Sequence, residues 1–311
     1  MRYGASKTRV NALKGDTAMA SSHILVGASQ TAADPTVRSI APADLVDALK
    51  KGWDDFSATP SHAVFLCVIY PVIGILVAAL TLGYAFVPLL FPAAAGFALI
   101  GPVAALGLYE LSRRRETGAE VSATDAFEVL RSPSLGAIVA LGLLLTVIFL
   151  VWVATANAIY TTFFGYGSPA SIGQFVHDLF FTRAGWSLIV VGNGVGLLFA
   201  IAAYLVSAVS FPLLLDREVG AAVAMLTSLR VVMQNPLTMT LWGLIVAALL
   251  LIGTIPLFLG LAVVIPVLGH ATWHLYRKAV VADQSPRADF RPQPAGKHHV
   301  ADFPVSLFKR D

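Results

Sequence analysis

The fold is decided by residues Asn235 to Lys278, which read NPLTMTLWGLIVAALLLIGTIPLFLGLAVVIPVLGHATWHLYRK. Leu237 to Ile255 contains no ionisable residue, and about 20 apolar residues are enough to cross the hydrocarbon core of a bilayer. Pro256 to Tyr276 predicts a crossing in the opposite direction, because the aromatic residues at its end precede the fixed charges of Arg277 and Lys278. Aromatic residues followed by basic ones are typical of a cytoplasmic exit. This stretch therefore predicts a helical hairpin that spans a membrane.

The composition of the whole chain is typical of membrane proteins. Of its 311 residues, 57% are apolar and 13% are charged, and the mean hydropathy is +0.77. Soluble domains carry about 25% charged residues. The net charge of +3 comes from basic tails and loops, which indicates orientation in a membrane rather than binding to nucleic acid. Cys67 is the only cysteine, which excludes an internal disulfide and a cysteine-based metal site.

Two further hairpins are predicted earlier in the chain, which gives six spans in total. Their spans are His62–Val87, Phe86–Leu111, Leu135–Tyr160 and Trp186–Leu215. In the last of these, Gly192 and Gly196 form a GxxxG pair, which favours close helix packing. In this arrangement Arg183 alone, of the 21 Lys and Arg residues, falls outside the cytoplasm. We therefore expect both termini to be cytoplasmic.

A short amphipathic helix is predicted on the cytoplasmic side before each hairpin. The first begins at Pro42, and it either lies along the inner membrane surface or packs against the spans; one face carries Val46, Leu49, Trp53 and Phe56. The second follows a capping box formed by Ser122 and Asp125. The third has a face made of Val219, Ala222, Val223, Leu226 and Leu229.

A helix is also expected outside the membrane, capped by Ser168 and started by Pro169. Its apolar face consists of Ile172, Phe175, Val176, Leu179 and Phe180. We expect this face to lie on the bilayer surface or to cap the helix bundle.

The hairpins look like three versions of one unit. Each unit runs from an amphipathic helix through a proline, two spans and a second proline to a cytoplasmic exit. Pro92 and Pro256 both lie ten residues before the second proline, and Arg113 and Arg277 both lie eleven after it. The alternative is that membrane hairpins simply look alike by composition.

We therefore predict an all-α membrane domain at residues 42–278 with a pseudo-threefold repeat of helical hairpins. The repeats cover about 42–115, 122–218 and 219–278, and their axis runs along the membrane normal. Residues 1–41 and 279–311 are predicted to be disordered cytoplasmic tails, because they are polar and contain proline and charged residues. Translation starts at Met1 or at Met19.

Two runs of the chain carry a resemblance to a known family. They read SFPLLLDREVGAAVAMLTSLRVVMQNP and LWGLIVAALLLIGTIPLFLGLAVVIPVLGHATWHLYRK. They resemble an uncharacterised family of bacterial integral membrane proteins, classed as a domain of unknown function, and the resemblance covers about residues 36 to 280. It implies a location in the bacterial inner membrane and no activity.

Some members of that family are labelled cytochrome c oxidase subunit I-like. The chain does not support a role as a subunit of a respiratory oxidase. The oxidase subunit has many more spans and holds haem and copper with histidines deep in the membrane. Here the histidines in or near the spans are His62, His270 and His274, all toward cytoplasmic ends.

Four ionisable residues near the cytoplasmic span ends form the candidate site. His270 and His274 lie one turn apart on one helix face. In the repeat, Asp216 takes the position of His270 and Glu110 takes that of His274. Together they would suit a divalent metal or a proton path. In the alternative interpretation, Glu110 pairs with the arginines that follow it, Asp216 sits beside water, and the histidines occupy the interface.

The sequence offers no support for catalysis. It contains no GxSxG, HExxH or Walker motif, and we expect no cofactor. Asn157 and Asn193 are further polar candidates, although amides in spans usually bond across helices.

We expect a non-enzymatic structural or accessory membrane component. Its partners would be the lipid bilayer and a second copy or another membrane protein, and not nucleic acid. The alternative is a transporter or channel for a small solute or an ion along the axis between the hairpins. Transporter sites usually lie near the midplane, where this chain has no ionisable residue.

Overall fold

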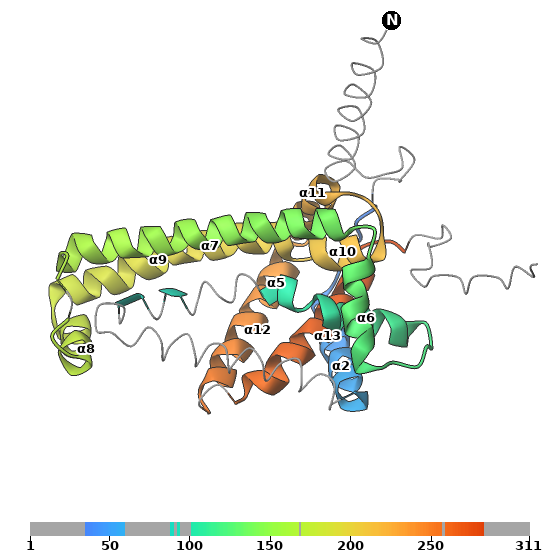
Figure 1. The fold of residues 1–311 in the computed structure, drawn as a ribbon, viewed down its shortest axis with the longest axis horizontal. Helices are drawn as coiled ribbons and strands as arrows, with labels where there is room; N and C mark the ends of the chain where they lie inside the picture. Colours follow the sequence, from blue (N-terminus) through green and yellow to red (C-terminus); the bar gives the residue numbers. More distant parts are fainter. Residues whose placement is uncertain are drawn as a thin grey trace, which may run out of the picture.

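The computed structural model describes residues 35–59, 88–89, 92–93, 101–167, 169–256 and 259–282. In this part of the chain the structure is helical, so the all-α prediction is confirmed there (Figure 1). The elements are α2 (Pro42–Ala58), α5 (Gly101–Ala104), α6 (Leu106–Glu116), the 3-10 helix η2 (Ala123–Arg131), α7 (Leu135–Phe164), α8 (Ile172–Phe181), α9 (Arg183–Ser207), α10 (Ser210–Asp216), α11 (Ala221–Gln234), α12 (Pro236–Thr254) and α13 (Leu261–Ala279).

Several predictions fall outside the described residues. They are the first span, most of the second span, most of both tails, the cap at Ser168, the two start sites, and the positions of His62 and Cys67.

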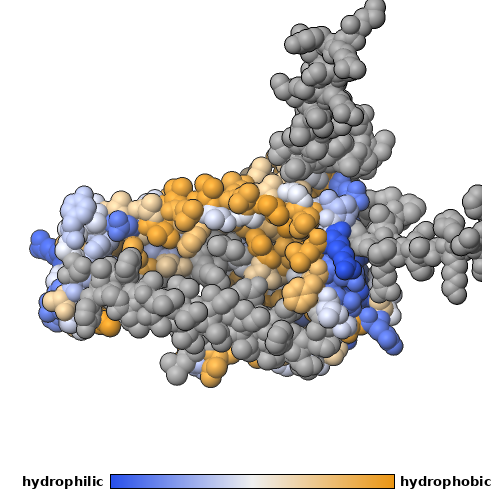
Figure 2. Space-filling view, in the orientation of Figure 1, coloured by the Kyte–Doolittle hydropathy of each residue, from blue (hydrophilic) through white to orange (hydrophobic). Residues whose placement is uncertain are grey.

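Three helical stretches among the described residues are long and apolar enough to cross a membrane. They are α7, the combined stretch of α9 and α10 from Arg183 to Asp216, and α12. Leu143 on α7 and Leu244 on α12 are more than half exposed, as expected for side chains that face lipid. Figure 2 shows this apolar surface between hydrophilic ends. The remaining predicted spans, the hairpin arrangement and the repeat stay predictions.

Helices α7 and α9 run side by side, with α8 at their far end (Figure 1). A Cβ atom on Gly196 would lie 3.0 Å from Cη2 of Trp152, so these helices approach closely at Gly196. Among the described residues, nothing lies within 4 Å of a Cβ atom placed on Gly192. In the described part of the chain, only one member of the predicted GxxxG pair therefore contributes to close packing.

Helix α8 begins three residues later than the sequence predicts. Ser171 has an extended backbone, and its Oγ accepts a hydrogen bond from the Gln174 N–H at 3.1 Å, so Ser171 is the cap. Phe175 lies against the rings of Tyr160 and Phe164, with centroids 6.3 and 6.2 Å away. The rest of the apolar face includes Ile172, Val176 and Phe180, each about half exposed.

The buried faces of α2 and α11 coincide only in part with the predicted apolar faces. In α2 the buried residues are Leu45, Ala48, Gly52, Asp55 and Phe56, while Val46 and Trp53 are 53% exposed. The reason is close helix approach: a Cβ atom on Gly52 would lie 2.7 Å from the Val267 carbonyl oxygen on α13. In α11 the small residues are also turned inward, namely Ala221, Ala224, Thr227 and Ser228, whereas Leu226 and Leu229 are exposed.

The two ends of the described chain lie together. Val37 and Val280 form an antiparallel bridge, and the Arg38 N–H donates to the Ala279 carbonyl at 2.8 Å. Asn235 joins them, because its Oδ1 accepts from the Ile40 N–H at 2.8 Å. Residues 36–41, which the sequence assigns to the tail, are therefore held against the helical domain by backbone hydrogen bonds.

Candidate functional site

A buried polar cluster joins α2, α6 and α13; its members are Asp55, Ser112, His270 and His274. The Oδ2 atom of Asp55 accepts a hydrogen bond from the Ser112 hydroxyl at 2.6 Å. It also lies 2.8 Å from Nε2 of His274. The Ser112 Oγ lies 2.7 Å from Nδ1 of His270, which places that imidazole 4.0 Å from Asp55. We call these four residues the Asp55 cluster.

Close helix packing positions the Asp55 cluster. Helix α13 passes between α2 and α6, because Gly52 lets it approach α2 and Gly269 lets it approach α6. A Cβ atom on Gly269 would lie 2.6 Å from Cδ1 of Leu108. Larger residues at these glycines would separate the helices and open the hydrogen bonds. Asp55 is 7% exposed, and Ser112 and His270 are each 1% exposed.

The environment favours the ionised form of Asp55. Burial by itself raises the pKa of the carboxyl group. Hydrogen bonds from His274 and Ser112 and the charges of the two histidines outweigh it, so the pKa of Asp55 lies below its usual value of 3.8. The Arg115 side chain also pairs with this carboxylate, with Nε 3.5 Å from Asp55 Oδ1. The cluster thus holds a carboxylate among hydrogen-bond donors.

Sequence reasoning identified the two histidines and missed their partners. Asp55 is not among the sequence-predicted candidates, because it stands among polar residues in the chain. The usable signal was the spacing of Ala48, Gly52 and Asp55, which places the carboxylate on the face with small residues. Ser112 offered no sequence signal, since a serine beside an arginine run is ordinary.

Glu110 belongs to a second network. Its carboxylate accepts two hydrogen bonds from Arg113, at 2.7 Å each, and one from Arg114 at 2.7 Å. The alternative interpretation for Glu110, pairing with the following arginines, is confirmed. Arg114 also pairs with Asp125 at 2.8 Å and with Glu128, which ties α6 to η2. This network therefore anchors the second short helix.

Asp216 belongs to a third network. It is 6% exposed and accepts a hydrogen bond from the Tyr276 hydroxyl at 2.7 Å, so the interpretation that it sits beside water is wrong. Nη1 of Arg277 lies 3.6 Å from its Oδ2. Arg277 in turn donates to Glu116 at 3.0 Å. These contacts join the ends of α6, α10 and α13.

The four predicted site residues therefore lie in three networks at one end of the helices, and the structure brings the two histidines together around Asp55. No group of three or more His, Cys, Asp or Glu side chains among the described residues is arranged to hold a metal ion. A ligand shared by His270, His274, Asp216 and Glu110 stays a prediction.

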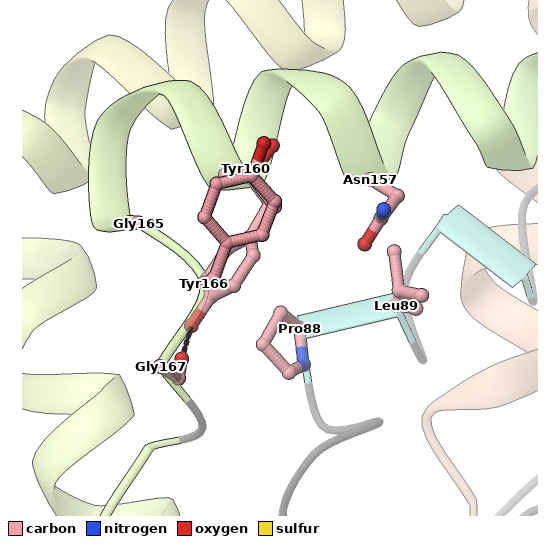
Figure 3. Close-up of a pocket in the computed structure, with 8 residues that line it drawn as sticks. Pro88, Leu89, Asn157, Tyr160, Gly165, Tyr166 and Gly167 are labelled. Atoms are coloured by element: carbon pink, nitrogen blue, oxygen red, sulfur yellow. Dashed lines mark hydrogen bonds between the residues drawn. The ribbon is translucent and has the colours of Figure 1, made fainter.

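A small pocket lies at the opposite end of the helices, beside the end of α7 (Figure 3). Its volume is about 180 Å³, below the roughly 300 Å³ at which ligand pockets usually begin. Asn157 and Tyr160 line it from α7, and Pro88 and Leu89 face them. The other amide candidate, Asn193, donates to the Ile189 carbonyl of its own helix at 2.7 Å.

Comparison with known proteins agrees with the membrane interpretation. No match was found among curated proteins or among solved structures. Residues 89–216, from the second span of the first predicted hairpin through α10, match the model of a family described as predicted integral membrane protein (DUF2189). Over this part of its length, the chain is thus similar to a family of integral membrane proteins of unknown function, as its sequence implied.

Proposed function

We propose that the protein is a multi-pass protein of the bacterial inner membrane with both termini cytoplasmic, and that it serves as a structural or accessory component rather than as an enzyme. A second copy or another membrane protein is the partner that this role requires. The observation that carries the proposal is the pairing of buried ionisable groups. Each of three buried carboxylates contacts a side chain of the protein. Asp55 contacts His274 on another helix, Glu110 pairs with Arg114 one turn along its own helix, and Asp216 accepts a hydrogen bond from Tyr276 on another helix. Such paired groups stabilise helix packing. The pocket in Figure 3 lies at the opposite end of the helices, and its described lining residues do not form a catalytic set.

A flux assay tests this role. The purified protein is reconstituted into vesicles that contain a pH-sensitive dye, and a potassium gradient with valinomycin sets the membrane potential. A structural or accessory protein should leave the dye signal equal to that of empty vesicles. A protein-dependent proton current would contradict the proposal.

The same assay addresses a second candidate function, an ion pathway that carries protons. The observation in its favour is the hydrogen-bonded series His274, Asp55, Ser112 and His270, which is continuous over three helices. Linked ionisable groups inside membrane proteins form proton relays. If the pathway exists, the Asp55→Asn variant should abolish the current. Asp54→Asn, at the exposed neighbouring position, should leave it unchanged.

A further inference from the structure

Two short helices carry the same local pattern. Residues 44–50 of α2 read DLVDALK, and residues 125–131 of η2 read DAFEVLR. The first carboxylate of each accepts a hydrogen bond from a backbone N–H three residues earlier, Asp44 from Ala41 at 2.8 Å and Asp125 from Ser122 at 2.9 Å. Each pattern ends with a leucine and a basic residue. Helix α11 repeats this ending, since its residues 224–230 read AMLTSLR.

In η2 and α11, unlike in α2, where Leu45 is buried, bulky side chains of the pattern point outward. Phe127 and Leu130 on η2 are 57% and 65% exposed, and Leu226 and Leu229 on α11 are 46% and 38% exposed. The basic residues that follow, Arg131 and Arg230, are exposed as well. An apolar stripe that ends in a basic residue is typical of a helix lying in a membrane surface.

Specific contacts fix this orientation. In α11, Ser228 Oγ accepts from the Val209 N–H at 3.3 Å, and the Ser210 hydroxyl donates to the Ala224 carbonyl at 3.1 Å. In η2, the ion pairs of Arg114 described above hold the polar side against α6, where Ala126 is packed on Gly107. Neither helix can turn its leucines inward without breaking these contacts.

The outward stripes continue into helices with lipid-facing surfaces. Leu226, Leu229 and Met233 of α11 lie at helical spacing, and Leu237 of α12 follows after the break at Asn235; Met233 and Leu237 are 68% and 79% exposed. Helix η2 ends four residues before α7, a candidate membrane span. A surface continuous with the spans fits acyl chains, and its arginines fit the phosphate level.

We propose that η2 and α11 lie in the membrane surface at the ends of the spans, with Phe127, Leu130, Leu226 and Leu229 among the acyl chains and Arg131 and Arg230 at anionic headgroups. This inference rests on the membrane topology proposed above. Both helices lie on the side of the membrane where α6 and α13 end and where the two ends of the described chain meet.

Site-directed fluorescence tests the proposal, because Cys67 is the only native cysteine. In a Cys67→Ser background, single cysteines replace Phe127, Leu130 or Leu229 and carry an environment-sensitive dye. Thr124→Cys, an exposed polar position of η2, is the matched control. Val147→Cys, exposed on α7, reports the span. The labelled full-length proteins are reconstituted into vesicles that contain phosphatidylglycerol and lipids with a doxyl quencher near the headgroup or near the chain end.

We expect the dyes at Phe127, Leu130 and Leu229 to lose most of their fluorescence to the shallow quencher and little to aqueous iodide. The dye at Thr124 should show the reverse, and the dye at Val147 should respond most to the deep quencher. Iodide quenching at Phe127 equal to that at Thr124 would overturn the proposal. Protection from both quenchers would also overturn it, because a protein surface would then cover these residues. If the deep quencher did not reduce the fluorescence of the dye at Val147, the result would instead contradict the topology.

Discussion

Nε2 of His274 lies 2.8 Å from Oδ2 of Asp55, although 219 positions separate the two residues in the chain. The contact joins the last described helix, α13, to the first, α2. It places a carboxylate and an imidazole where little water reaches them. The contact between the two groups therefore offsets the cost of removing each of them from water.

Replacing Asp55 should destabilise the protein strongly. In Asp55→Ala, the His274 and Ser112 side chains lose their shared acceptor, and removing one partner of a buried polar pair costs about 3 kcal/mol or more. Thermal unfolding in mild detergent, followed by circular dichroism, measures this. Asp54→Ala should change the unfolding midpoint little, since Asp54 is exposed. Equal effects of the two variants would contradict a structural role of the cluster.

The contribution of the Asp55 carboxylate should depend on pH. Its pKa in the folded protein lies below 3.8, because the hydrogen bonds from His274 and Ser112 outweigh burial. A lowered pKa means that the ionised form stabilises the fold above 3.8, and that this stabilisation is lost as the pH falls through the folded value. The difference in unfolding midpoint between wild type and Asp55→Asn should therefore stay constant down to mildly acidic pH and shrink only in strong acid. A difference that vanished near neutral pH would assign it to another group.

Gly52→Ala should separate α2 from α13. The added Cβ would lie 2.7 Å from both the Val267 carbonyl oxygen and the Ala271 backbone nitrogen, and backbone atoms cannot yield as a side chain can. Overpacking of this kind costs about 2 kcal/mol. The control is Gly192→Ala, where a Cβ meets no described residue within 4 Å, and helix propensity predicts no loss of stability. Thermal unfolding of both variants measures this, and the midpoint should fall for Gly52→Ala and not for Gly192→Ala.

The contact of Phe175 on α8 with Tyr160 and Phe164 on α7 should protect the segment between α7 and α9 from proteolysis. Changing Phe175 and Leu179 together to Asp removes the contact of α8 with Tyr160 and Phe164 and adds two charges. We expect faster cleavage between α7 and α9 by a protease added on the outer side. Gln174→Asp, at an exposed position of the same helix, serves as the control. Unchanged cleavage in the double variant would mean that this face contributes nothing to holding α8.

Reporter fusions test the proposed topology. Fusions at Gly118, Gly220 and Gln284 should give a cytoplasmic signal, and a fusion at Gly167 should give an external one. The reason is that this topology places every Lys and Arg residue except Arg183 on the cytoplasmic side. Alkaline phosphatase and green fluorescent protein, used as a pair at each position, make the two outcomes distinguishable. A cytoplasmic signal at Gly167 would contradict the six-span arrangement, which places three spans before this loop and three after it.

The sequence by itself determined the membrane character and the helical class. Long uncharged stretches such as Leu237 to Ile255 can satisfy their backbone only as helices in lipid, and this constraint acts locally, so it can be deduced without a partner. The carboxylate cap at Asp125 and the pairing of Glu110 with its neighbouring arginines are likewise contacts over three or four residues.

Only the tertiary structure decided which side of each short helix is buried and what the histidines bind. Hydrophobic periodicity assigns bulky residues to the inside, but α2 and α11 are held by close approach at Gly52 and by the hydroxyl of Ser228, so their small residues face inward. His274 meets Asp55 because two glycines allow α13 to pass between α2 and α6. A contact over 219 positions depends on the packing of whole helices, and no local pattern in the chain encodes it.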